Sequence, residues 1–135
     1  MREELKEWIG KAEGDYFSAM REYRARKHVN HDSACFHAQQ CIEKYFKALL
    51  EKQGGMIRKI HALPVLLDQC AETYPFLIAM RPDMVRLSVY AVEFRYPGES
   101  ASVEDAKNAI SIMKRARTEL RILLELERQG RGVNP

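Results

Sequence analysis

Apolar residues in this chain return every three or four positions through almost its whole length, which is the spacing of one face of an α-helix. The alternation of apolar and polar residues that marks a half-buried strand is missing. The first segment illustrates the helical pattern with Leu5, Ile9, Ala12, Tyr16, Ala19 or Met20, and Tyr23. We therefore predict an all-α protein, an up-and-down bundle of four to five helices.

Turn-forming residues divide this pattern into separate helices. The first is expected from about residue 3 to residue 26, before a polar turn at residues 28–31. The second should begin near Asp32, a good N-cap residue, and stop at Gly54-Gly55. Ser102 and Asp105 have the spacing of a capping box, which would open the last helix. The remaining helices are expected over residues 63–73, 82–94 and 103–128.

The chain is short enough for one domain. Its 135 residues are expected to form a bundle over residues 1–129 and a flexible tail over residues 130–135. The charged N-terminus lacks the apolar core of a signal peptide, and no apolar run reaches the roughly 18 residues that cross a bilayer. The three cysteines lie in apolar helical contexts without C-x-x-C spacing. These features predict a cytoplasmic location and no contact with a membrane.

The net charge of +3 is small, but it is unevenly placed. From residue 114 onward, six basic side chains accompany three acidic ones, so this segment carries the whole net charge. Lys107, Lys114, Arg121 and Arg128 are spaced seven apart and should share the side of the last helix opposite the core. Such a surface either favours polyanions modestly or is the solvated face of a bundle helix.

The second predicted helix combines a wide apolar stripe with a polar one. An apolar stripe this wide indicates burial on more than one side. On the polar side, His37, Gln40, Lys44 and Lys47 are candidates for binding a phosphate. The alternative is a solvated face, in which Lys47 pairs with Glu43 and Gln40 with Lys44. His37 lies at the edge of the apolar arc, so we expect it to be partly buried and hydrogen-bonded rather than catalytic.

Four segments, in order, resemble the HEPN domain family. Residues 36–50 read F-H-A-Q-Q-C-I-E-K-Y-F-K-A-L-L and are similar to its second helix, F-H-x-Q-Q-x-x-E-K-x-x-K-A-L-L. Residues 11–16 resemble its opening K-A-x-x-D-hydrophobic pattern, and residues 60–63 resemble the H-x-L before its third helix. Arg95-Tyr96-Pro97 resembles the R-Y-P before the last helix in one HEPN branch. Together these segments span most of the chain.

The resemblance implies a bundle of four or five helices, of the type found in nucleotidyltransferase substrate-binding subunits, and commonly a homodimer. Members often act beside a minimal nucleotidyltransferase as nucleotide- or substrate-binding halves, and some of these pairs are toxin–antitoxin systems. Another large branch consists of metal-independent RNases, which use an Arg-x(4–6)-His motif near the dimer interface.

This chain departs from the RNase motif. Arg95 lies near the place of the catalytic arginine, but no histidine follows it, and the last histidine of the chain is His61. Histidine is the usual acid–base group near neutral pH, so we predict no catalytic residue. Suitably spaced pairs lie at the end of the first helix, the wrong place for the family: Arg26 with His31, and Arg21 with His28.

Arg95 and Tyr96 have a second interpretation, as a guanidinium and a stacking ring for a nucleotide. The alternative is a helix-ending turn in which Arg95 reaches back to Glu93. Because Pro97 and Gly98 are enough to end a helix, we favour a functional role, with the ligand between this turn and the polar side of the second helix.

Three functions therefore stay open. The favoured one is a homodimeric module that binds a nucleotide, RNA or a partner nucleotidyltransferase. The others are a metal-independent RNase with a degenerate Arg/His site and a purely structural dimerisation domain. No cofactor is predicted, and no metal either, because His28, His31 and Asp32 lack an evident fourth ligand.

Overall fold

The computed structural model describes residues 2–55 and 59–126, and within them the chain is helical with no strand. The all-α prediction is confirmed. The elements are α1 (Glu3–Arg24), α2 (His31–Lys52), α3 (Leu63–Ala71), the 3-10 helix η1 (Pro75–Met80), α4 (Arg81–Glu93) and α5 (Val103–Leu123). None of these helices is both long and apolar enough to cross a membrane.

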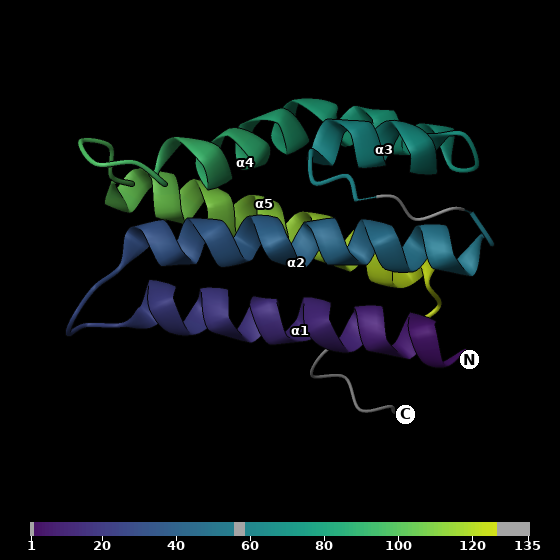
Figure 1. Cartoon of the computed structure of the whole chain (residues 1–135), viewed down its shortest axis with the longest axis horizontal. Helices are drawn as coiled ribbons and strands as arrows, with labels where there is room; N and C mark the ends of the chain where they lie inside the picture. The colour runs from purple at the N-terminus through teal and green to yellow at the C-terminus, as the bar shows by residue number, and fades with distance from the viewer. Residues whose placement is uncertain (1, 56–58, 127–135) are drawn as a thin grey trace.

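The helix α2 is the centre of the bundle. It contacts α1, α3, α4 and α5. Figure 1 shows α1 antiparallel to it on one side, α3 and α4 on the other, and α5 crossing behind. Ile42, Tyr45, Phe46 and Leu49 of α2 are completely buried. The prediction that this helix is buried on more than one side is confirmed.

Local capping chemistry sets the ends of α2 and the start of α5. The capping box predicted for α5 is present: Asp105 N donates to Ser102 Oγ over 3.0 Å, and Ser102 N donates to the Asp105 carboxylate over 2.9 Å. After α2, Gly54 adopts a φ of 77°, and Gly55 N bonds back to the Leu50 carbonyl over 2.9 Å. Glycine tolerates this left-handed backbone, so the predicted stop is confirmed.

Some predicted boundaries are wrong. The N-cap of α2 is Asn30, whose side chain accepts from Ser33 N over 2.9 Å. Asp32 instead accepts from Ala101 N over 2.6 Å, because α2 begins beside the segment that precedes α5. The sequence did not predict η1, which starts at a proline directly ahead of α4. The helix α5 ends at Leu123, and both its predicted end at Arg128 and the proposed tail lie outside the described residues.

The predicted basic stripe on α5 is wrong at Arg121. Its side chain is only 15% exposed, and it donates to Tyr45 Oη over 2.8 Å. Its Nη1 also lies 3.6 Å from a Glu13 carboxylate oxygen. Because α5 contacts both α1 and α2, the buried side of α5 is wider than the apolar pattern indicated. Lys107 and Lys114 are exposed, as expected.

Candidate functional site

A pocket of about 550 Å³ opens between α2, the segment that leads into α3, and α4. Phe36, Ala62, Ala91 and Val92 form its apolar walls. Its polar lining is concentrated on the α2 side and at the end of α4: Gln39, Gln40, Glu43, His61, Ser88 and Arg95. The pocket therefore combines apolar walls with a few polar groups, which is the usual composition of a small-ligand site.

The buried carboxylate of Glu43 organises the floor of this pocket. Glu43 is only 3% exposed, and a buried charge requires partners. Gln39 Nε2 donates to Glu43 Oε1 over 3.1 Å, and Lys47 Nζ donates to Glu43 Oε2 over 3.0 Å. Lys47 is itself buried and lies 5.5 Å from the ring centre of Trp8, so its ammonium balances the carboxylate.

His61 brings an imidazole from a different segment to the same carboxylate. Its Nδ1 lies 2.8 Å from Glu43 Oε2, while 72% of its side chain is exposed. Gln39 Nε2 also donates to the His61 carbonyl oxygen over 3.1 Å, which fixes the backbone at this position. Because a carboxylate oxygen accepts, Nδ1 is the ring nitrogen that donates in this contact, and Nε2 takes no part in it.

Of the predicted site residues, the structure brings Gln40 and Arg95 into this pocket. Gln40 Nε2 donates to Gln39 Oε1 over 2.8 Å, so it is tied to the Glu43 network. Tyr96 follows Arg95 in the turn after α4 and is 60% exposed. Among the described residues, Arg95 forms no ion pair, so the alternative pairing with Glu93 is not made.

The other predicted residues, His37, Lys44, Lys47 and Tyr96, do not line the pocket. His37 Nδ1 lies 2.8 Å from Asp15 Oδ1 on α1, and Lys44 forms an ion pair with the other Asp15 oxygen. His37 is thus partly buried and hydrogen-bonded, as expected. The alternative of a solvated face is wrong for Glu43 and Lys47, which pair with each other but are both buried.

A family model described as the HEPN domain matches residues 5–123, and this match includes all the residues that line the pocket. The chain belongs to the HEPN family. A search of the curated proteins gives no match. At the level of the family, HEPN membership makes this chain a nucleotide- or RNA-related helical module.

The HEPN fold is also recognised in a solved structure. The crystal structure of an archaeal HEPN homologue matches with a TM-score of 0.70 and 26% sequence identity. The match covers 90% of this chain and 97% of that chain. The resemblance inferred from the four sequence segments is therefore confirmed, together with the helical bundle.

Sequence reasoning missed four polar members of the pocket in this HEPN domain: Gln39, Glu43, His61 and Ser88. A usable signal was present, because Gln39 and Glu43 are polar residues four apart inside the apolar arc of α2. A polar side chain buried in such an arc must find a hydrogen-bond partner. His61 supplies such a partner to Glu43 from outside the helix, and no spacing in the sequence reveals that these two residues pair.

A second polar network joins α1, α2 and α5 on another side of the HEPN bundle. Glu13 accepts from Arg117 over 2.7 and 2.6 Å and from the Tyr45 hydroxyl. Burial raises the pKa of Glu13, but the hydrogen bonds from Arg117 and Tyr45 and the charges of Arg117 and Arg121 outweigh it, so the pKa lies below its ordinary value. This network is central to the packing, because it joins three helices through buried side chains.

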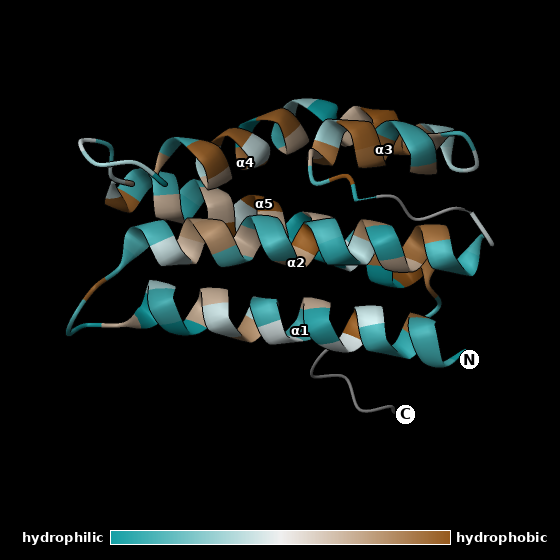
Figure 2. Ribbon diagram, in the orientation of Figure 1, coloured by the Kyte–Doolittle hydropathy of each residue, from teal (hydrophilic) through white to brown (hydrophobic). Residues whose placement is uncertain are grey.

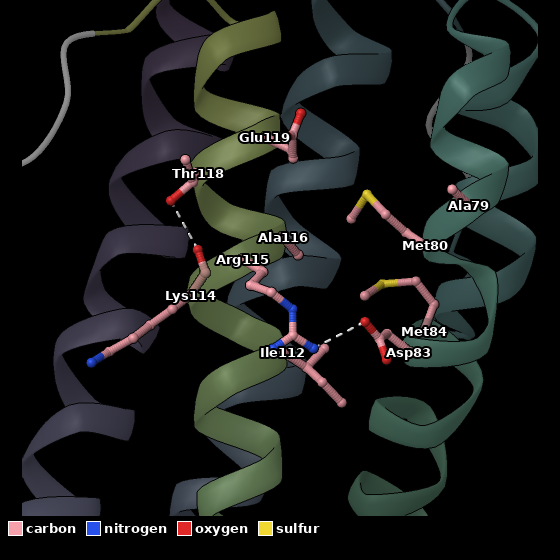
Figure 3. A pocket seen from close by; sticks show the side chains of 10 residues that line it. All are labelled: Ala79, Met80, Asp83, Met84, Ile112, Lys114, Arg115, Ala116, Thr118 and Glu119. Atoms are coloured by element: carbon pink, nitrogen blue, oxygen red, sulfur yellow. Dashed lines mark hydrogen bonds and ion pairs between the residues drawn. The ribbon is translucent and has the colours of Figure 1, made fainter.

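A further cavity of about 500 Å³ lies between α5 and the η1–α4 segment. In Figure 3, Met80, Met84 and Ile112 face this gap, and Arg115 reaches across it to Asp83, with Nη2 3.1 Å from Oδ2. Lys114 extends away from the gap. Because Arg115 is already paired with the Asp83 carboxylate, this cavity is less suited to a phosphate than the pocket at Arg95.

Proposed function

We propose that this HEPN chain is a homodimeric binding module that holds the phosphate of a nucleotide or of RNA in the pocket at Arg95. The observation that carries the proposal is that Arg95, Gln40 and His61 line one pocket although they come from three segments. The carboxylate on the pocket floor already has a cationic partner in Lys47, so the Arg95 charge is available to an anion.

The chemistry of these groups suits a nucleotide. A guanidinium binds phosphate through paired hydrogen bonds, and each charge-assisted bond contributes about 1.5–3 kcal/mol when well aligned. The Gln40 amide and the His61 imidazole can contact the sugar or the base. Tyr96 beside Arg95 offers an exposed ring, and stacking on a base contributes about 1–3 kcal/mol.

A minimal nucleotidyltransferase is the partner protein that we propose, in a toxin–antitoxin-like pair located in the cytoplasm. The family resemblance suggests this partner. The cysteines support the location, because Cys35, Cys41 and Cys70 are all free and buried, as expected in a reducing compartment.

The test is a binding titration with adenosine monophosphate and with a short single-stranded RNA. We expect Arg95→Ala to lower the affinity for the tighter-binding ligand at least tenfold, since a loss of about 1.4 kcal/mol in binding free energy is one decade in affinity. Lys107→Ala, an exposed cation on α5, is the matched control and should bind as the wild type does. Equal affinity of the wild type and Arg95→Ala would overturn the proposed site.

One observation favours a second candidate, a metal-independent RNase. The Arg-x(4–6)-His motif is absent from the sequence, but the fold places His61 in the pocket of Arg95 and orients its ring through Glu43. In that reaction, His61 Nε2 takes the proton from a ribose 2′-hydroxyl, and the 2′-oxygen attacks phosphorus. The bond from phosphorus to the 5′-oxygen breaks, which leaves a 2′,3′-cyclic phosphate, and the 5′-oxygen takes its proton from water. Arg95 stabilises the charge on the phosphoryl oxygens.

RNA incubated with the protein in a chelator separates the two candidates. Under the binding proposal, structured and single-stranded RNA both stay intact. Cleavage that disappears in both His61→Gln and Arg95→Ala would make the RNase the better assignment. Cleavage that disappears only on changing His28 or His31 would point instead to the connection between α1 and α2.

A further inference from the structure

An apolar stripe runs along the outer side of α4. Val85, Val89 and Val92 follow one another at i, i+4 and i+7 and therefore share one face of the helix. They are 42%, 46% and 58% exposed, whereas Met84 and Leu87 on the inner side are buried. Figure 1 shows α4 along the edge of the bundle, and hydrophobic positions recur along its ribbon in Figure 2. An apolar stripe at such an edge is a surface suited to a protein partner.

The charges of α4 indicate which partner fits. Arg81 and Asp83 each form an ion pair with another element of the same chain, at 3.1 Å in both cases. Arg86 and Glu93 form no ion pair within residues 2–55 and 59–126. They are seven positions apart, so they lie on the same flank of the valine stripe, one toward each end of the helix.

We propose that a second copy of this chain packs on the valine stripe, with the two α4 helices antiparallel about a two-fold axis near Val89. Val85 then lies opposite Val92 of the partner subunit, and Arg86 lies opposite Glu93 of the partner subunit. The two-fold axis repeats both pairs. This inference rests on the homodimer in the proposed function and assigns it a surface.

Charge complementarity selects the antiparallel arrangement. In an antiparallel pair, the same flank of each helix meets in reversed order, so each unpaired cation faces an unpaired anion. In a parallel pair, the flank with Arg86 and Glu93 would instead meet the partner's opposite flank. Ser88 and the pocket arginine Arg95 lie on that opposite flank, so no carboxylate of α4 would be available to Arg86. The arrangement is self-complementary, as a two-fold interface requires.

The stripe is continuous with further exposed apolar surface. A stable dimer buries about 800 Å² on each partner, which is more than one helix face provides. Phe36, which is 39% exposed, lines the pocket together with Val92, and Tyr96 lies three residues beyond Glu93. The pocket therefore opens beside the proposed interface.

Charge reversal tests this interface. We expect light scattering of the wild type at micromolar concentration to give about twice the chain mass of 15.7 kDa. Arg86→Glu and Glu93→Arg should each raise the dimer dissociation constant at least about tenfold, because like charges then meet. The double variant should return to within about threefold of the wild type, since the pairs are restored with reversed sign. Arg26→Glu, a reversal at an exposed arginine of the α1–α2 loop, is the control and should leave the constant unchanged.

Each contrary result overturns a definite part of the inference. A wild-type dimer that both single variants leave intact would exclude the α4 face while keeping the homodimer. Single variants that dissociate without rescue in the double variant would exclude the antiparallel pairing. A wild-type monomer would overturn the homodimer itself, and the nucleotide titration would still decide the binding site. Circular dichroism of every variant checks that the helices remain folded.

Discussion

Arg117 of α5 donates two hydrogen bonds to the Glu13 carboxylate of α1, from Nε over 2.7 Å and from Nη2 over 2.6 Å. The guanidinium also lies 4.0 Å from the centre of the Tyr16 ring. Because 104 positions separate the two residues, this ion pair joins the first helix to the last. Arg117 is 6% exposed, so its charge depends on this carboxylate.

Replacing Glu13 by Gln should therefore destabilise the protein, by about 3–5 kcal/mol near pH 7, because it removes the buried carboxylate that balances the charge of Arg117. The pKa of Glu13 in the folded protein lies below the ordinary 4.5. Its stabilisation is thus present above that value and is lost as the pH falls through the folded pKa. Urea unfolding from neutral to acidic pH should show the gap between wild type and variant closing in acid.

The control for this measurement is Glu119→Gln, at an exposed position of α5. It should change the free energy of unfolding by less than about 0.5 kcal/mol at every pH. If Glu13→Gln remained as stable as the wild type at pH 7, the ion pair would have no net effect on the fold.

Ser102→Ala removes the side chain that accepts from Asp105 N at the start of α5. The loss of such a cap costs about 1 kcal/mol. We expect a Tm lower by roughly 3–6 °C in thermal unfolding, given the size of the chain. Ser100→Ala, two positions earlier and outside the capping box, serves as the matched control. Equal Tm values for the two variants would contradict the role of the cap.

The three cysteine thiols should resist alkylation in the folded protein. Burial raises the pKa of Cys70 to about 12, and burial together with the nearby carboxylates of Asp105 and Asp32 raises that of Cys35 to about 12. The pKa of Cys41 is also raised, mainly by complete burial. Since the thiolate is the reactive form, iodoacetamide at pH 8 should label all three rapidly only in denaturant. Rapid labelling of any of them in the native protein would contradict this burial.

Lys44→Ala distinguishes the pocket from the wider site on α2 that the sequence suggested. Lys44 is ion-paired with Asp15 and lies outside the pocket, so we expect its removal to lower Tm and to change nucleotide affinity by less than about threefold. If Lys44→Ala instead lowered the affinity about tenfold, as expected for Arg95→Ala, the ligand would have to extend along α2 toward His37. Wild-type affinity should also fall as salt rises, because part of the attraction is to phosphate.

Local signals in the sequence were enough for the helices and for the family. The periodicity of α2, the capping box at Ser102 and the glycine stop at Gly54 each depend on residues a few positions apart, and each is present in the structure. The HEPN resemblance used the same short segments. Only part of the site could be reached in this way, since Gln40 and Arg95 line one pocket but the other four predicted residues do not.

The rest depended on which helix faces meet. The sequence showed His37, Lys44 and Lys47 as one polar side of a helix, but packing against α1 turns the first two to Asp15 and buries the third against Glu43. The seven-residue spacing likewise predicts a solvated Arg121, whereas the packing of α5 places it against Tyr45 and Glu13. The chain by itself determined its helices, because their hydrogen bonds and caps are local. Only the tertiary structure decided the partners of its buried charges, because a charge that loses water takes whatever opposite charge the neighbouring helix presents.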